Sequence, residues 1–253
     1  MEDGEPDLSR YFEVARRAKH CSVLTGAGVS AESGMPTFRG EGGLWREFRA
    51  EELATQEAFS RNPDLVREWY EYRRGLLEDI EPNDGHRALA MAEEIFEEFT
   101  LITQNVDGLH QYAGSTDVVE LHGNLRRDRC NDCGAPRREG QEGRYCDCGG
   151  PFRPDVVWFG EALPQDAIYR AMGAAGSAEL FFSVGTSTVV FPAAQLPYIA
   201  KDAGAFVVEV NPEPTPFTPL ADLIVRGPSG QWLPLLIEPL MRPAGEGSPE
   251  GSR

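Results

Sequence analysis

The sequence predicts an α/β protein, with a Rossmann-type, doubly wound parallel sheet, a smaller domain and a helical insertion. Three observations lead to this fold class. Short apolar runs alternate with helical patterns along most of the chain, and this order favours a parallel sheet. A glycine-rich turn follows the first apolar run. Between residues 124 and 154 apolar residues become scarce, and Arg, Asp, Gly and Cys dominate.

The apolar runs predict six strands, at residues 21–25, 99–103, 118–121, 180–184, 205–210 and 222–225. A first helix is expected from the spacing of Leu8, Phe12, Ala15 and Lys19. Further helices are expected from Asn62-Pro63 onward and over 86–97, 164–175 and 193–203. The last helix is predicted to begin near Leu233-Pro234, because proline suits a first helical turn.

The predicted division of the chain follows these patterns. A large sheet domain takes residues 8–45, 84–123 and 155–242, the helical insertion takes 46–83, and the small domain takes 124–154. Residues 243–253 are rich in Gly, Pro, Ser and Glu and are expected to form a disordered tail.

Composition limits the partners of this chain. Its net charge is −17, with 41 acidic and 24 basic residues, and Lys19 and Lys201 are its lysines. Such a surface repels phosphate backbones, which argues against nucleic-acid binding. Salt screens charge repulsion, so the charge favours a salt-rich cytoplasm; the alternative is simply an acidic protein. No apolar run approaches the ~20 residues that span a bilayer and no signal segment opens the chain, so we expect no membrane partner and a cytoplasmic location.

Four cysteines predict a zinc ribbon in the small domain. Cys130-x-x-Cys133 and Cys146-x-Cys148 form two close pairs, and tetrahedral zinc takes four such thiolates in a closed, structural site. The second pair is shorter than C-x-x-C, so its turn must be tighter or be relieved by Gly149-Gly150. The alternative is four reduced surface cysteines. The fifth cysteine, Cys21, is expected to be a small buried apolar residue.

The turn after the first strand has a dinucleotide-binding pattern. Gly26, Gly28 and Ala31 match G-x-G-x-x-G/A, in which bare backbone lets a pyrophosphate approach amide groups. The alternative is a βα turn whose glycines serve sterics alone. The loop that follows is crowded with polar residues and glycines, which favours closure over a polar ligand.

Polar residues also follow other predicted strands, at the edge where α/β sheets bind ligands. Gln104, Asn105 and Asp107 follow the strand 99–103, and taken alone they are better explained as an Asx-turn cluster. His122 follows the strand 118–121, and its position fits structure and chemistry equally well. Gly185, Thr186 and Ser187, and Asn211, follow later strands and suit contacts to phosphate or ribose.

Six segments, in order, resemble the sirtuins, the NAD-dependent protein deacylases. They are GAGVSAESGMPTFRGEGGLW (26–45), TQNVDGLH (103–110), ELHGN (120–124), RPDVVWFGE (153–161), VGTS (184–187) and VNPEPTP (210–216). The resemblance implies one catalytic region over 8–242, NAD as co-substrate, one structural zinc ion and acylated lysines of proteins as partners. It implies transfer of the acyl group from lysine to ADP-ribose with release of nicotinamide.

The resemblance also implies residue roles. His122 would be the general base and Asn105 a second catalytic residue. The implied NAD-binding set is Gly26, Ala27, Gly28, Ser30, Glu32, Thr37, Phe38, Arg39, Trp45, Gln104, Asn105, Val106, Asp107, Gly185, Thr186, Ser187, Asn211, Pro212, Glu213 and Ser229. Within it, Asn105 and Asp107 would hold the nicotinamide and its ribose. Asn211, Glu213 and Ser229 would line the adenosine end.

The implied substrate-binding residues are Tyr70, Arg73, Val157, Trp158 and Phe159. Residues 156–159 are similar to the sirtuin segment that pairs with a substrate peptide as an added strand. Tyr70 and Arg73 have i, i+3 spacing and resemble the Y-x-x-R pair of the desuccinylase-like branch. The alternative is a solvated pair on a charged helix, and neighbouring Tyr72 and Arg74 leave the register ambiguous.

Two other functions compete with a deacylase. A Rossmann dehydrogenase would carry an acidic residue about twenty positions past the glycines, at the end of a second strand. Here that stretch is a glycine-rich loop and a helical region, which disfavours a dehydrogenase. A non-catalytic NAD-binding or zinc-ribbon module leaves His122 beside the 104–107 segment unexplained.

Overall fold

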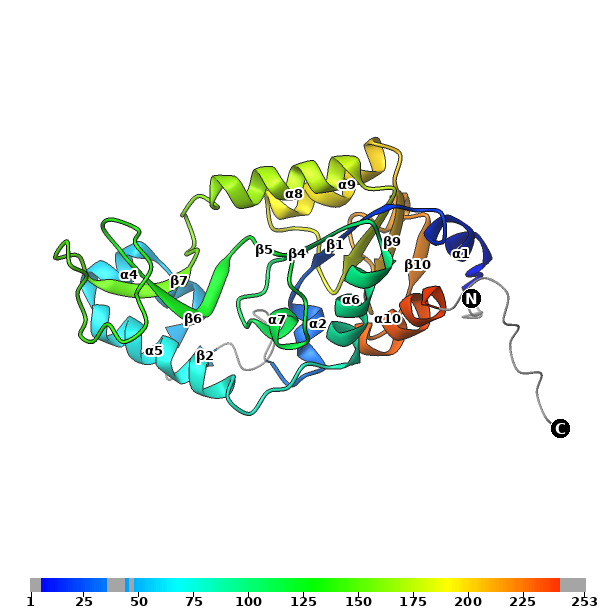
Figure 1. The fold of residues 1–253 in the computed structure, drawn as a ribbon. Coiled ribbons are helices and arrows are strands. Elements are labelled where there is room, and N and C mark those ends of the chain that lie inside the picture. Colours follow the sequence, from blue (N-terminus) through cyan, green and yellow to red (C-terminus); the bar gives the residue numbers. More distant parts are fainter. Residues whose placement is uncertain (1–5, 36–43, 46–47, 242–253) are drawn as a thin grey trace.

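A computed structural model describes residues 6–35, 44–45 and 48–241 of the chain (Figure 1). Within these residues, one six-stranded parallel sheet has the order β10-β9-β8-β1-β4-β5. Its strands are β1 (His20–Thr25), β4 (Glu98–Thr103), β5 (Val118–Glu120), β8 (Leu180–Val184), β9 (Phe206–Val210) and β10 (Leu223–Val225). Each of the six predicted strands is therefore present, with bounds shifted by at most one residue.

The strand order identifies the ligand-binding edge of the sheet. Numbered along the chain, the six strands lie in the order 3-2-1-4-5-6, which is the Rossmann order. Successive strands are added on one side of β1 up to β5 and on its other side from β8 onward, so the strand order reverses between β1 and β8. These two strands pair in parallel from Cys21↔Leu180 to Thr25↔Val184. The crevice beyond the carboxyl ends of β1 and β8 is thus the expected ligand site.

Helices cover both faces of the sheet (Figure 1). Helices α1 (Ser9–Ala15), α6 (Asp84–Ile95) and α10 (Ser229–Ile237) pack on one face, and α8 (Gln165–Ser177) and α9 (Leu196–Asp202) on the other. Successive strand residues alternate between the faces: Val23 joins the first core and Leu24 the second. Because both faces are buried, these strands have nearly continuous apolar sequences.

A third core joins the helical insertion to residues outside it, among them Leu125, Val156 and Trp158. The elements of this region are β2 (Leu44–Trp45), β3 (Phe48–Arg49), α3 (Ala50–Leu53), α4 (Gln56–Arg61) and α5 (Pro63–Leu76). The side chain of Asn62 caps α5 by accepting a hydrogen bond from the Leu65 amide at 3.2 Å, and Pro63 occupies the first turn. This start is the one that Asn62-Pro63 predicts. Phe59, Tyr70 and Trp158 are among the buried side chains of this core.

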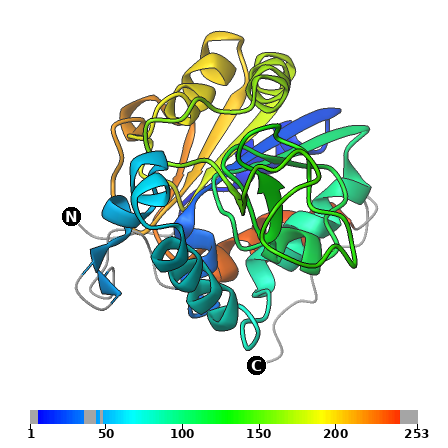
Figure 2. The ribbon, with the colours of Figure 1, turned by 90° about the vertical axis from the view of Figure 1, so that its left-hand side faces the viewer.

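The cysteine-bearing segment extends from an antiparallel ribbon of β6 (Gly123–Cys130) and β7 (Phe152–Val156). Figures 1 and 2 place this ribbon and helices α4 and α5 together at one end of the sheet. The remaining short elements are α2 (Ala27–Ala31), α7 (Leu109–Tyr112), η1 (Ala193–Gln195), η2 (Thr218–Leu220) and η3 (Glu238–Leu240). Among the described residues, no helix is both long and apolar enough to cross a membrane.

Two helix boundaries differ from those predicted. Helix α1 ends at Ala15, short of Lys19, whose amide donates to the Glu179 carboxylate at 2.5 Å. Helix α10 begins at Ser229, so Pro234 lies inside it and the predicted start is wrong. The Glu32 carboxylate accepts hydrogen bonds from Ser229 Oγ at 2.7 Å and from the Gly230 amide at 2.9 Å. A carboxylate stabilises a helix N-terminus, and this one comes from 197 positions earlier in the chain.

Candidate functional site

Two glycine turns meet backbone to backbone at the reversal point of the sheet. The amide of Gly28 donates to the carbonyl of Gly185 at 2.8 Å. A Cβ atom on Gly28 would lie 2.7 Å from Gly185 Cα, and Gly185 itself has φ +59°. The glycines therefore allow a close approach that side chains would prevent. The steric role that was the alternative is thus present at these two glycines, and they lie at the edge where a Rossmann sheet binds its ligand.

Asn105 joins this turn to the end of β4. Its Nδ2 donates to the Gly26 carbonyl and to Ser30 Oγ, both at 3.0 Å, while its amide donates to Thr103 Oγ1 at 3.0 Å. Three residues that the resemblance implies to bind NAD, Gly26, Ser30 and Asn105, are thus in direct contact. Asn105 Nδ2 is committed to these bonds, so the side-chain carbonyl is the group it can turn toward a ligand.

Gln104 links the same loop to β8 and to His122. Its Nε2 donates to Thr186 Oγ1 at 2.8 Å, and its backbone carbonyl lies 2.9 Å from Nδ1 of His122. Because a carbonyl only accepts, the proton of a neutral His122 sits on Nδ1 and the lone pair on Nε2. Burial lowers the pKa of His122, partly opposed by the bond to Gln104. The imidazole is therefore held neutral, with Nε2 able to accept a proton.

Asp107 is a buried carboxylic acid in this cluster. Its Oδ1 accepts the Leu109 amide at 2.9 Å, as in an Asx-turn. Burial raises the pKa of Asp107, whereas the hydrogen bonds and the nearby guanidinium groups of Arg126 and Arg73 lower it. The Asx-turn that was the alternative is thus present, and it coexists with a place beside Asn105.

The residues predicted to line the adenosine end of NAD are held in place by hydrogen bonds. Glu32 holds Ser229 through the capping bonds of α10. Asn211 Nδ2 donates to the Glu213 carbonyl at 2.7 Å, just beyond β9. Of the other predicted NAD residues, Ala27 starts α2, Val106 is buried, Ser187 is exposed, and Pro212 follows Asn211. Thr37, Phe38 and Arg39 lie outside the described residues, and for Trp45 only the backbone of β2 is described.

Sequence reasoning missed Asn83 and Thr188. Asn83 Nδ2 donates to the Val29 carbonyl at 2.8 Å and to Ser33 Oγ at 3.0 Å, while its Oδ1 caps α6. Its place just before a helix was the available signal. Thr188 has φ +50°, the only positive value among described non-glycine residues, and its buried Oγ1 has no partner there. Nothing in the sequence indicates this strain, which is typical of functional sites.

One of the predicted substrate residues, Val157, is in direct contact with His122. The amide of Val157 donates to the His122 carbonyl at 2.9 Å. Trp158 is buried, and its Nε1 donates to Tyr70 OH at 2.8 Å. Phe159 is 53% exposed. Residues 157–159 thus run beyond the end of β7 at Val156, past His122.

The structure fixes the register of α5. Tyr70 is 3% exposed, so the alternative of a solvated pair is wrong for this residue, whereas Tyr72 is 50% exposed. Arg73 lies over the Trp69 ring at 5.1 Å, and burial lowers the pKa of its guanidinium. Arg74 turns instead to the Leu125 carbonyl and to Asp128 of the β6–β7 ribbon. Tyr70 is therefore buried and Arg73 packs on Trp69, whereas Arg74 belongs to the contact with the ribbon.

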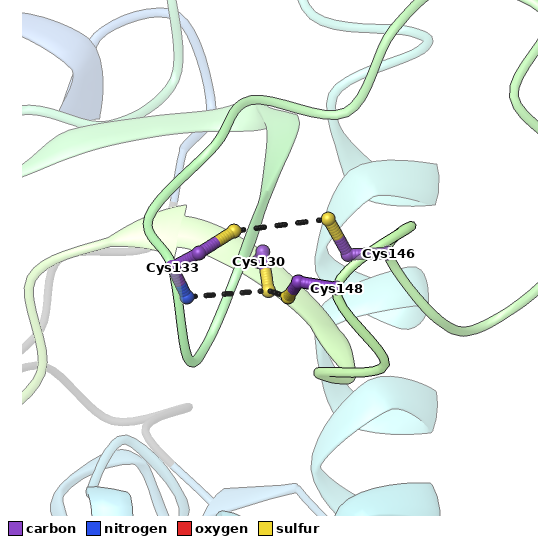
Figure 3. Close-up of side chains that lie close together, drawn as sticks. All are labelled: Cys130, Cys133, Cys146 and Cys148. Carbon is purple, nitrogen blue, oxygen red and sulfur yellow. Dashed lines mark hydrogen bonds between the residues drawn. The ribbon is translucent and has the colours of Figure 1, made fainter.

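The four cysteines of the small domain converge (Figure 3). Their Sγ atoms all lie within 4.8 Å of one another, with Cys130 and Cys148 at 3.5 Å and Cys133 and Cys146 at 3.8 Å. Zn–S bonds of about 2.3 Å in a tetrahedron place sulfurs about 3.8 Å apart, so the cluster fits zinc. Gly149 has φ +90°, which confirms that a glycine relieves the shorter second turn.

Known proteins match this chain in sequence and in fold. The model of the Sir2 family matches residues 26–192. The NAD-dependent protein deacylase of Aquifex aeolicus is 57% identical over 207 residues, 79% of this chain and 87% of that protein. A solved Sir2 homologue in complex with NAD has a TM-score of 0.83 and 43% identity, covering 91% of this chain and 93% of its own.

A further solved structure, of Sir2 with a p53 peptide and NAD, has a TM-score of 0.80 and 33% identity. The match covers 92% of this chain and 98% of that one. The family match spans the glycine turns, the 104–107 loop, His122 and the four cysteines, and it agrees with the resemblance in the sequence. The chain is therefore a member of the Sir2 family, the sirtuins.

Proposed function

We propose that this sirtuin is an NAD-dependent protein-lysine deacylase that moves the acyl group from lysine to ADP-ribose and releases nicotinamide. The carrying observation is the hydrogen-bonded chain from His122 through Gln104 to Thr186, beside Asn105 and the Gly26 turn. It places a neutral imidazole next to the crevice where a Rossmann sheet binds a dinucleotide. Relatives of this chain bear the name NAD-dependent protein deacylase.

The residues present fit NAD. The turns of Gly28 and Gly185 lie at the edge where a Rossmann sheet binds a dinucleotide, and Asn105 and Asp107 would hold the nicotinamide end. When bound, NAD supplies the ribose that receives the acyl group and nicotinamide as leaving group. His122 Nε2 takes up the proton of a ribose hydroxyl, while Gln104 holds Nδ1–H and thereby the ring orientation.

Zinc has a structural role in this proposal. Cys130 lies at the far end of β6 from Gly123, which adjoins His122. An eight-residue strand spans roughly 20 Å, so the metal cannot touch the reacting atoms. Four thiolates also leave no open position for water.

For the acyl group we propose a preference that includes succinyl-lysine. Tyr70 is fixed by Trp158, next to the segment that passes His122. Arg73, one turn along α5, is a partly desolvated guanidinium. A succinyl group ends in a carboxylate, which a guanidinium binds bidentately and a phenol assists.

Three expectations from the sequence stay proposals. They are the cytoplasmic, salt-rich location, the lack of nucleic-acid and membrane partners, and the division into domains at 46, 84, 124 and 155 with a disordered tail from 243. The net charge of −17 supports the first two. The third core supports a helical insertion as a unit beside the sheet, although it also includes Val106, Leu125, Val156 and Trp158.

One assay separates the candidate functions. Pure protein is mixed with NAD and an acetyl- or succinyl-lysine peptide, and nicotinamide, NADH and peptide mass are measured. A deacylase releases nicotinamide in step with loss of the acyl mass. NADH formation would indicate a dehydrogenase, and neither product would indicate a non-catalytic module. A panel of acyl-lysine peptides then ranks the acyl groups.

A further inference from the structure

A cleft lined by arginines lies between α5 and the β6–β7 ribbon. It has a volume of about 300 Å³, at the lower end of the range of small-molecule sites. Its cationic lining residues are Arg67 and Arg74 of α5 and Arg137, Arg144 and Arg153 of the cysteine-bearing segment, and its acidic ones are Glu71 and Asp128. Five guanidinium groups around one cleft stand out in a chain of net charge −17.

The carboxylates near the cleft do not match these cations one to one. Asp64 is shared by Arg67 at 3.2 Å and Arg144 at 2.5 Å. Asp128 is likewise shared by Arg74 and Arg137. Glu71 also lines the cleft, and Glu161 binds Arg153, so five guanidinium groups meet four carboxylates. The one positive charge in excess attracts a further anion.

Several of these arginines are held in place by backbone carbonyls. Arg67 Nη2 donates to the Phe152 carbonyl at 3.2 Å, and Arg137 Nε donates to the Gln141 carbonyl at 2.9 Å. Such bonds fix the guanidinium groups without neutralising them. A ligand therefore meets an ordered set of donors and loses little binding free energy to ordering them.

Arg153 is the most buried of these arginines. It is 3% exposed, and its two Nη atoms bind Glu161 at 2.5 and 3.0 Å. Its guanidinium also lies over the Trp158 ring at 3.1 Å. It therefore contributes its charge to the wall of the cleft from a fixed position.

We propose that this cleft is a binding site for a small multivalent oxyanion of the phosphate class, separate from the NAD crevice. Planar guanidinium groups match the oxygen spacing of phosphate and bind it bidentately. The cleft lies between α5 and the ribbon, whereas NAD belongs to the carboxyl ends of β1 and β8. Tyr70 lines the cleft as well, so the cleft adjoins the acyl pocket proposed above. Binding of an oxyanion here does not itself require deacylase activity.

The test is calorimetric titration of the full chain with inorganic phosphate at low ionic strength. The protein is first saturated with ADP-ribose, so that phosphate cannot occupy the NAD crevice. Arg144→Gln is compared with Arg138→Gln, a matched control on the same segment. Both arginines are largely exposed and both bind one carboxylate at 2.5 Å, Asp64 and Asp147 respectively, but only Arg144 lines the cleft.

The expected result is one phosphate per chain, bound at least about five-fold more weakly by Arg144→Gln and unchanged by Arg138→Gln, because one charge-assisted contact is lost. Sodium chloride at equal ionic strength should give no saturable heat. Absence of phosphate binding by the parent overturns the proposal. Equal weakening by both variants overturns it as well, since that outcome indicates diffuse surface attraction.

Discussion

Nδ1 of His122 donates a hydrogen bond of 2.9 Å to the backbone carbonyl of Gln104. This one contact determines which ring nitrogen is the base, and it ties the base to the loop that carries Asn105. His122 follows β5 and reaches the loop after β4, because these two strands are neighbours in the sheet.

His122→Ala should abolish deacylation and leave NAD binding and the fold largely intact. Loss of a general base costs about 10²–10⁴ in rate, and the side chain lies at a strand end, outside the cores. Turnover at saturating NAD is the measurement, with NAD affinity and thermal midpoint as controls. Near-parental turnover would show that His122 is structural.

Zinc should be present at one ion per chain, and Cys130→Ser should lose it together with stability of the ribbon. The ribbon beyond Cys130 has few apolar residues, so metal binding contributes directly to its folding. Zinc content is measured by elemental analysis and stability by thermal unfolding. Cys21→Ala is the matched control, because Cys21 is buried in β1 and should leave zinc content unchanged.

Arg73→Met should lower desuccinylation far more than deacetylation, and the parent should remove succinyl at least as efficiently as acetyl. Charge-assisted bonds to a buried carboxylate are worth about 1.5–3 kcal/mol each, enough for a tens-fold effect. The measurement is kcat/KM on matched succinyl- and acetyl-lysine peptides.

Tyr70→Phe and Tyr72→Phe form a matched pair for the same pocket. Tyr70 is buried and accepts a hydrogen bond from Trp158, whereas Tyr72 is half-exposed. Only the first change should impair desuccinylation. If the parent strongly prefers the acetyl peptide, or if Arg73→Met lowers kcat/KM equally on both peptides, Tyr70 and Arg73 do not form a succinyl pocket.

Acid should destabilise the protein through His86 and His110. Their buried rings lie 4.8 Å apart. Burial lowers the pKa of His86 to about 4 and that of His110 well below its usual value. Below pH 6.5 the unfolded chain takes up protons that the folded chain refuses, so stability falls between pH 6.5 and 4 by about 1.4 kcal/mol per pH unit per histidine. Above pH 6.5 both states are neutral, and this effect vanishes.

Urea unfolding at several pH values measures that dependence. His86→Gln should flatten the slope between pH 6.5 and 4 by about the share of one histidine. The His86 charge also lowers the pKa of His110, so the difference between the parent and the variant reports His86 together with its effect on His110. Identical slopes would show that His86 binds a proton in the folded state as readily as in the unfolded state.

Stability should rise with salt into the molar range. Screening weakens surface ion pairs as well as repulsion, but exposed pairs contribute little, and 41 acidic residues outnumber 24 basic ones. At 1 M salt the Debye length is about 3 Å. Screening should therefore remove more repulsion between carboxylates than attraction within ion pairs, and the protein should become more stable. A thermal midpoint that stays flat or falls as potassium chloride rises refutes the salt-rich location.

The sequence alone determined the sheet and the chemistry of its edge. Both faces of the sheet are buried, so its strands have nearly continuous apolar sequences. Such runs can be predicted from the local sequence without knowing which strands pair. Gly26, Gly28 and the two cysteine pairs are local patterns, because tight turns and thiolate ligation depend on residues close in sequence.

Only the tertiary structure decided which side chains act together. Helix α10 begins where Glu32 caps it, and Tyr70 is distinguished from Tyr72 by Trp158, contacts that span long stretches of chain. The arginine cleft likewise joins α5 to a segment about 70 residues later. Helical spacing predicts which residues of α5 share a face. Which segments pack against each face depends on contacts between distant parts of the chain, and no local sequence pattern encodes them.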